Sequence, residues 1–147
     1  MKKQSVVILS KLLSNLSVLQ QKTKNYHWHV RGENFSELHA LFGEQYKELD
    51  EEQDEIAERI RMLGEASPAT FKDFLSLASL TEDITSFMAS NVMISNLLKD
   101  HQFIIESVHS GLTELEGSRD EGSKDLLTNI LRAHEKISWI LGSYLGI

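Results

Sequence analysis

The 147-residue chain contains no cysteine and only one proline. Without thiol groups it can form no disulfide, and it offers neither a thiolate metal ligand nor a cysteine nucleophile. No stretch reaches the roughly 18 uncharged apolar residues of a membrane-spanning helix, so we expect no contact with a membrane. Positive charge is also scarce, because 15 Lys and Arg residues face 22 Asp and Glu residues, a formal charge of −7. The surface is therefore expected to attract cations and to repel nucleic acid phosphates.

The composition is that of a globular protein, with 41% hydrophobic and 25% charged residues. The length fits one ordinary domain, so we expect a single domain over residues 1–147. The first residues imitate a signal peptide, but Lys11 and Asn15 interrupt the apolar run and no small-x-small cleavage site follows. We therefore interpret the start of the chain as mature sequence.

Apolar residues recur at intervals of three and four in four long segments, a pattern that predicts amphipathic helices. The first covers residues 5–30. The second begins after residues 31–34, where Asn34 and Glu37 resemble a capping box, and it runs to Gly64. A third starts at about Glu82 and a fourth at about Ser123, separated by the turn residues 117–122.

The connections between these segments differ in length. The first two helices are joined by about four residues, whereas residues 64–81 separate the second from the third and contain a short apolar segment, Phe71–Leu77. Two hairpins joined by one long crossover is the connectivity of ferritin-like four-helix bundles. Because no sustained alternation favours strands, we predict an all-α fold of this kind with a short helix in the crossover.

Two histidines and two carboxylates form the candidate metal site. His27 lies about one turn before the first hairpin loop and His39 about one turn after it, so antiparallel packing places both imidazoles at the same height. Asp54 and Glu58 are spaced i, i+4 on one face of the second helix. However, His39 and Asp54 are separated by roughly 22 Å along that helix, too far for one ion to bridge.

A second copy of the chain removes this difficulty. If the second helix packs antiparallel against its own copy near residues 47 and 48, His39 of one chain meets Asp54 and Glu58 of the other. Two-fold symmetry then gives two identical sites. Imidazole with carboxylate is a ligand set that suits iron and similar divalent ions.

These residues stand in a sequence that resembles the ferroxidase signature of the Dps proteins, the miniferritins. The similarity continues to the C-terminus and covers nearly the whole chain. The residues that carry it are Asn25-Tyr26-His27-Trp28, Gly32, Phe35, Leu38-His39, Phe42, Tyr46, Asp54-Glu55-Ile56-Ala57-Glu58-Arg59, Asp120, Asp125-Leu126-Leu127 and His134 to Trp139.

The resemblance implies a cytoplasmic, hollow dodecamer that protects against oxidative stress. Such a shell binds Fe(II) between two-fold-related subunits, oxidises it preferentially with hydrogen peroxide and stores a ferric mineral. His27 and His39 match the ligands from one subunit, and Asp54 and Glu58 match those from its partner. The resemblance also implies that Trp28 lies beside the site and that Asp120 and Asp125 line pores on the three-fold axes.

The sequence departs from the family pattern at two positions near the site. Gly43 stands where the family usually has Asp or Glu, with Glu44 immediately after it. His29 stands where Asn is common, as either a compensating ligand or an exposed side chain.

Simpler interpretations accompany each of these assignments. His27 and His39 taken alone would be hydrogen-bonded core histidines, which is also what we expect of His101 and His134, since these fall on apolar stripes. Glu51, Glu52 and Glu55 are interpreted as a solvated helix face, and Trp28 and Trp139 as core or interface residues.

Two alternative functions stay open. The Gly43 departure allows a structural shell with weak or lost iron oxidation. A DNA-coating protein is disfavoured, because only Lys2 and Lys3 precede the first helix and the net charge opposes duplex binding.

Overall fold

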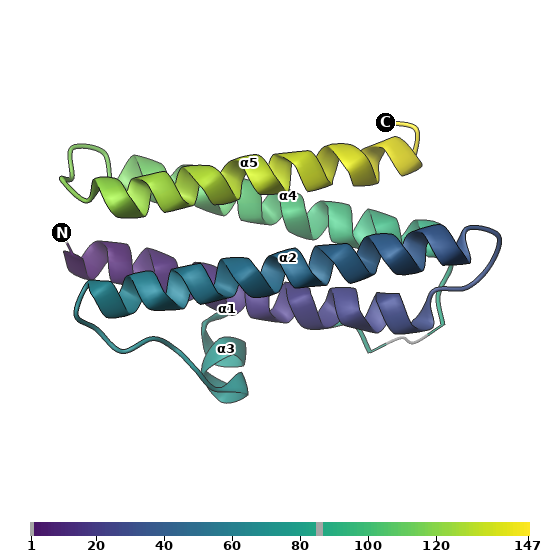
Figure 1. Cartoon of the computed structure of the whole chain (residues 1–147), viewed down its shortest axis with the longest axis horizontal. Coiled ribbons are helices and arrows are strands. Elements are labelled where there is room, and N and C mark those ends of the chain that lie inside the picture. Colours follow the sequence, from purple (N-terminus) through teal and green to yellow (C-terminus); the bar gives the residue numbers. More distant parts are fainter. Residues whose placement is uncertain (1, 85–86) are drawn as a thin grey trace.

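A computed structural model describes residues 2–84 and 87–147 of the chain. In this part of the chain there are five helices and no strands: α1 (Lys2–His29), α2 (Phe35–Met62), α3 (Phe71–Leu77), α4 (Ser90–Glu114) and α5 (Glu121–Tyr144). The four long helices form a bundle (Figure 1). The predicted all-α, ferritin-like class is confirmed.

The topology also follows the loop lengths. Helices α1 and α2 form one antiparallel hairpin and α4 and α5 form the other (Figure 1). The crossover from α2 to α4 runs from one end of the bundle to the other, and α3 lies about midway along it, against α1. The long crossover with its short helix is therefore confirmed.

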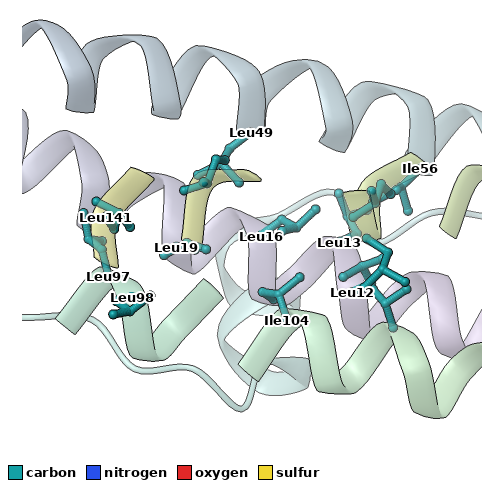
Figure 2. Packing of buried hydrophobic residues seen from close by; sticks show 14 of the residues in the cluster. Leu12, Leu13, Leu16, Leu19, Leu49, Ile56, Leu97, Leu98, Ile104 and Leu141 are labelled. Atoms are coloured by element: carbon teal, nitrogen blue, oxygen red, sulfur yellow. The ribbon is translucent and has the colours of Figure 1, made fainter. Parts of the chain in front are cut away.

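Aliphatic side chains from all four long helices meet along the bundle axis (Figure 2). Leu16 and Leu19 of α1, Leu49 of α2 and Leu97 of α4 are fully buried. Burial of each such side chain stabilises the fold by about 2 kcal/mol. This core fixes the rotation of every helix and hence the faces that carry the histidines and carboxylates.

Some predicted boundaries are wrong. Helix α4 begins at Ser90 and not at Glu82. Ile84 and Phe87 match the apolar spacing of a helix but are 97% and 61% exposed, and residues 85 and 86 lie outside the described residues. Helix α5 begins at Glu121, slightly before the predicted Ser123.

The predicted capping box at the start of α2 is also wrong. The side chain of Asn34 makes no capping hydrogen bond. The carboxylate of Glu37 instead accepts a hydrogen bond from the hydroxyl of Tyr144, which ties the start of α2 to the end of α5. A capping box does occur at α3, between Thr70 and Asp73.

Candidate metal centre

The imidazole rings of His27 and His39 stack against each other at the closed end of the first hairpin. Their centroids are 3.8 Å apart and their planes differ by 14°. His27 lies in the last turn of α1 and His39 in the second turn of α2, so the short connection between the helices brings them level. The expectation that these two side chains face each other is confirmed.

Each ring is oriented by the backbone of the other histidine. His27 Nδ1 lies 2.6 Å from the carbonyl oxygen of His39, and His39 Nδ1 lies 2.7 Å from the carbonyl oxygen of His27. A carbonyl oxygen can only accept a hydrogen bond, so each Nδ1 carries a proton. In the neutral imidazole, Nε2 then bears a free lone pair. Metal-binding histidines commonly have this arrangement, with the second ring nitrogen donating to a carbonyl oxygen.

Neighbouring side chains enclose the imidazole pair. The ring of Phe35 stacks on His39 at 5.2 Å, and Tyr46 meets His27 edge-on at 5.4 Å. Gly43 lies directly beneath His27, where an added Cβ would be 3.0 Å from Cε1 of the ring. The imidazole of His27 therefore occupies the space that a side chain at position 43 would need.

Asp54 and Glu58 are exposed on α2 and lie several turns beyond His39. Within residues 2–84 and 87–147 of one chain, no three His, Asp or Glu side chains come together in a group that could hold a metal ion. A single chain thus brings the two histidines together, but it does not bring the two carboxylates to them.

His29 does not compensate for the missing carboxylate. It lies about 200° around α1 from His27, on the other side of the helix. Its Nδ1 is 2.8 Å from the carbonyl oxygen and 2.7 Å from the side-chain oxygen of Asn25, and its ring meets Phe87 edge-on at 5.4 Å. The interpretation of His29 as a ligand of the same site is therefore wrong.

The two tryptophans are surface residues in the isolated chain. Trp28, which follows His27 in the sequence, is 61% exposed, and Trp139 is 68% exposed on α5. Their interpretation as core residues is wrong, while an interface role stays a prediction.

The two candidate pore residues differ in their surroundings. The carboxylate of Asp120 accepts hydrogen bonds from the guanidinium of Arg59 and from the backbone N–H of Ser123, which caps α5. Burial raises the pKa of Asp120, but the nearby Ser5 hydroxyl and hydrogen bonds from Ser123 and Arg59 outweigh it and lower the pKa to about 2. Asp125 is exposed, and none of the salt bridges in the described part of the chain involves it.

A second histidine pair lies in the middle of the bundle. The Nδ1 atoms of His101 and His134 are 2.8 Å apart, and both residues are fully buried, which confirms the expected pairing. Glu52 accepts a hydrogen bond from His134 Nε2 at 2.8 Å, so its interpretation as part of a solvated face is wrong. One signal could have placed Glu52 on the buried face, though not identified its partner: Glu52 follows Leu49 by three residues and precedes Ile56 by four, within the apolar stripe of α2.

Among the described residues, no helix is long and apolar enough to cross a membrane.

Comparisons with known proteins agree with this architecture. The sequence profile of the ferritin-like domain matches residues 7–147. The chain is 36% identical to DNA protection during starvation protein 2 of Bacillus anthracis over 146 residues, which cover 99% of each protein. Among solved structures, antigen TpF1 of Treponema pallidum superimposes with a TM-score of 0.96 at 28% identity, covering 99% of this chain and 94% of that one.

A Dps protein from Vibrio cholerae O1 superimposes with a TM-score of 0.92 at 31% identity, covering 98% of this chain and 92% of that one. The bundle topology, the imidazole pair at the hairpin end and these similarities over nearly the full length lead to one assignment. The chain belongs to the ferritin-like family and, within it, to the Dps miniferritins.

Proposed function

We propose that this protein oxidises Fe(II) with hydrogen peroxide at sites formed between two-fold-related chains and stores the ferric product inside a hollow shell. One observation carries the proposal: the carbonyl bonds of His27 and His39 leave both Nε2 atoms free to bind a metal ion. The Vibrio cholerae protein is described as a member of a superfamily of ferritin-like diiron-carboxylate proteins, which supports iron as the substrate.

The partner chain would supply the carboxylates. His39 and Asp54 are about 22 Å apart along α2, so acids of the same chain cannot reach an ion held by the imidazoles. An antiparallel copy of α2 would place the partner's Asp54 and the partner's Glu58 beside His27 and His39. The exposure of Asp54 and Glu58 in the isolated chain is consistent with this pairing.

The stacked geometry favours two ions per site. An imidazole binds a metal along its Nε2 lone pair, which lies in the plane of the ring. Because the rings are nearly parallel with centroids 3.8 Å apart, one ion cannot lie in both planes. Each ring would therefore hold its own ion, and the carboxylates of the partner chain would bridge the two, at the short separation known from other two-metal sites.

Two adjacent Fe(II) ions match the electron count of peroxide reduction. Each ion gives up one electron and becomes Fe(III). The two electrons break the O–O bond of hydrogen peroxide, and two protons complete two water molecules. Delivery of both electrons to one peroxide molecule avoids release of a hydroxyl radical.

The assembly and the entry route also belong to the proposal. In a dodecamer the acidic surface would draw Fe(II) toward pores on the three-fold axes. We assign this role to Asp125 in preference to Asp120, because Arg59 already neutralises the carboxylate of Asp120. A cytoplasmic location and a role against oxidative stress fit this chemistry.

Replacement of His39 by alanine tests the assigned site. Peroxide consumption is measured after addition of Fe(II) to the assembled wild-type protein and to the His39→Ala variant. We expect the variant to lose most of the rate, because it removes one ligand and the ring that stacks on His27. His109→Ala is the control, since His109 is exposed on α4 away from the pair. Equal rates in wild type and His39→Ala would contradict the assignment.

A shell that protects DNA without efficient iron oxidation is the second candidate function. It is favoured by the name of the Bacillus anthracis relative and by the absence of a carboxylate at Gly43. Calorimetry with Fe(II) or Zn(II) separates the two functions, because a purely structural shell binds no ion between its subunits. With a net charge of −7 per chain, we expect no tight retention of duplex DNA at moderate salt and neutral pH.

A further inference from the structure

We propose that Gly43 is the positioning residue of the metal site: its missing side chain provides the space in which the imidazole of His27 stacks and points its Nε2 at the ion. This inference rests on the proposed function and explains how the site is built without a carboxylate of its own at this position.

The first observation is the close approach of His27 to the backbone of α2. A Cβ atom at position 43 would lie 3.0 Å from Cε1, 3.2 Å from Nδ1 and 3.9 Å from Nε2 of His27. The first two distances are shorter than ordinary van der Waals contacts, so the ring would have to shift by a few tenths of an ångström.

The ring has little freedom to move. His39 stacks on one of its faces at 3.8 Å, and the carbonyl oxygen of His39 holds its Nδ1 at 2.6 Å. Tyr46 lies against it edge-on. A shift away from position 43 would therefore disturb the stack or the hydrogen bond, which together set the direction of the Nε2 lone pair.

The second observation is the unfavourable placement of a glycine here. Gly43 is the only glycine in the 28 residues of α2, and it is buried in the interior of the helix. Glycine at such a position destabilises a helix relative to alanine. The contact with His27 supplies a reason for its presence that helix formation does not.

The metal-free protein provides the first test. Histidine-selective ¹⁵N labelling and solid-state NMR report which ring nitrogen of each imidazole is protonated. We expect paired Nδ1–H signals from His27 and His39 in wild type and their loss in Gly43→Ala. Gly142→Ala is a matched control, because the added Cβ of this helical glycine meets only the carbonyl oxygen of Ile147 at 3.6 Å. Unchanged Nδ1–H signals in Gly43→Ala would overturn the inference.

Zinc binding by the assembled protein provides the second test, because Zn(II) binds without redox chemistry. We expect Gly43→Ala to weaken Zn(II) binding about tenfold or more, as is typical when the groups that orient a ligand are lost. In a His27→Ala background the same substitution should have no further effect, since its target is gone. An equal effect in both backgrounds would show that Gly43 does not act through His27.

Gly43→Asp sharpens the test, because it adds a carboxylate together with the same Cβ. We expect weaker Zn(II) binding than in wild type. Tighter binding, or an additional bound ion, would overturn the inference. If either variant fails to assemble because of the collision, the additional His27→Ala substitution should restore assembly, and failure to restore it would also count against the inference.

The results separate this inference from the proposed function. A wild-type protein that binds no Zn(II) would contradict the proposed metal site, yet the NMR comparison of the metal-free proteins would still decide the role of Gly43.

Discussion

His27 and His101 both lie on largely apolar helix faces, but their Nδ1 atoms meet different partners. His27 Nδ1 donates to a backbone carbonyl, whereas His101 Nδ1 faces the Nδ1 of His134. Since His134 Nε2 donates to the carboxylate of Glu52, the neutral pair places the shared proton on His101 Nδ1. Nε2 of His101 is then an unprotonated nitrogen in the core, without a partner in the described part of the chain. The same residue type thus serves as a candidate ligand at one site and as a buried, neutral group at the other.

The buried pair makes stability depend on pH. Burial, followed by the electrostatic effect of the neighbouring His134, holds the pKa of His101 well below its usual value near 6.5. The unfolded chain therefore takes up a proton below about pH 6.5 that the folded chain does not, and stability falls with decreasing pH by up to about 1.4 kcal/mol per pH unit. We expect His101→Gln to show a shallower loss than wild type in urea unfolding between pH 6.5 and 5. His109→Gln should retain the wild-type slope, and equal slopes in all three proteins would contradict the prediction.

At the scale of the helices, apolar spacing and loop length were sufficient to predict the bundle, its two hairpins and the height of His27 and His39. They failed at the start of α4, because Ile84 and Phe87 repeat the helical spacing in a segment that exposes both side chains. They also failed at Glu52, whose partner His134 lies on α5, far along the sequence. Periodicity indicates which face of a helix is buried, but it does not identify the side chain that another helix presents to it.

Helices α1 and α4 approach closely at Gly111. An added Cβ at this position would lie 2.8 Å from Cγ2 of Ile8, so in Gly111→Ala either the Ile8 side chain or the helices must shift. We expect this variant to be less stable than wild type by about 1–3 kcal/mol, as is usual for overpacked cores. Gly142→Ala should instead gain up to about 1 kcal/mol from helix propensity, because its Cβ meets only ordinary contacts. Denaturant unfolding at one fixed protein concentration measures both, and a stabilised Gly111→Ala variant would contradict the close approach.

At the scale of the whole molecule, two of the four proposed ligands, Asp54 and Glu58, lie too far along α2 to bind an ion that the histidines of the same chain hold. The sequence predicted this from helix length alone, and the structure agrees that one chain gathers no complete ligand set within residues 2–84 and 87–147. What neither could provide is the orientation of the second copy. That depends on the fit of two surfaces, and we expect the exposed Trp28 and Phe35 to lie at that contact.

Mixed assembly tests the two-chain site directly. One parent chain carries His27→Ala with His39→Ala, and the other carries Asp54→Ala with Glu58→Ala. A dimer of the two has one site with all its ligands and one with none. Random pairing of equal amounts makes half of the dimers mixed, so about a quarter of all sites should bind Zn(II) and oxidise Fe(II).

Each parent alone should be inactive in the same assays. A mixture that is as inactive as its parents, although mass spectrometry shows mixed particles, would contradict the shared site.

The bonds between each imidazole and the opposite backbone also join two helices across the hairpin end. An open hairpin would release both carbonyl oxygens to solvent and let each ring rotate about its Cβ–Cγ bond, so the nitrogen aimed at the ion would no longer be defined. The proposed metal ligands and the hydrogen bonds that join α1 to α2 therefore involve the same few atoms. Local opening of this hairpin end by heat or mild denaturant would therefore abolish the proposed iron oxidation before the bundle itself unfolds.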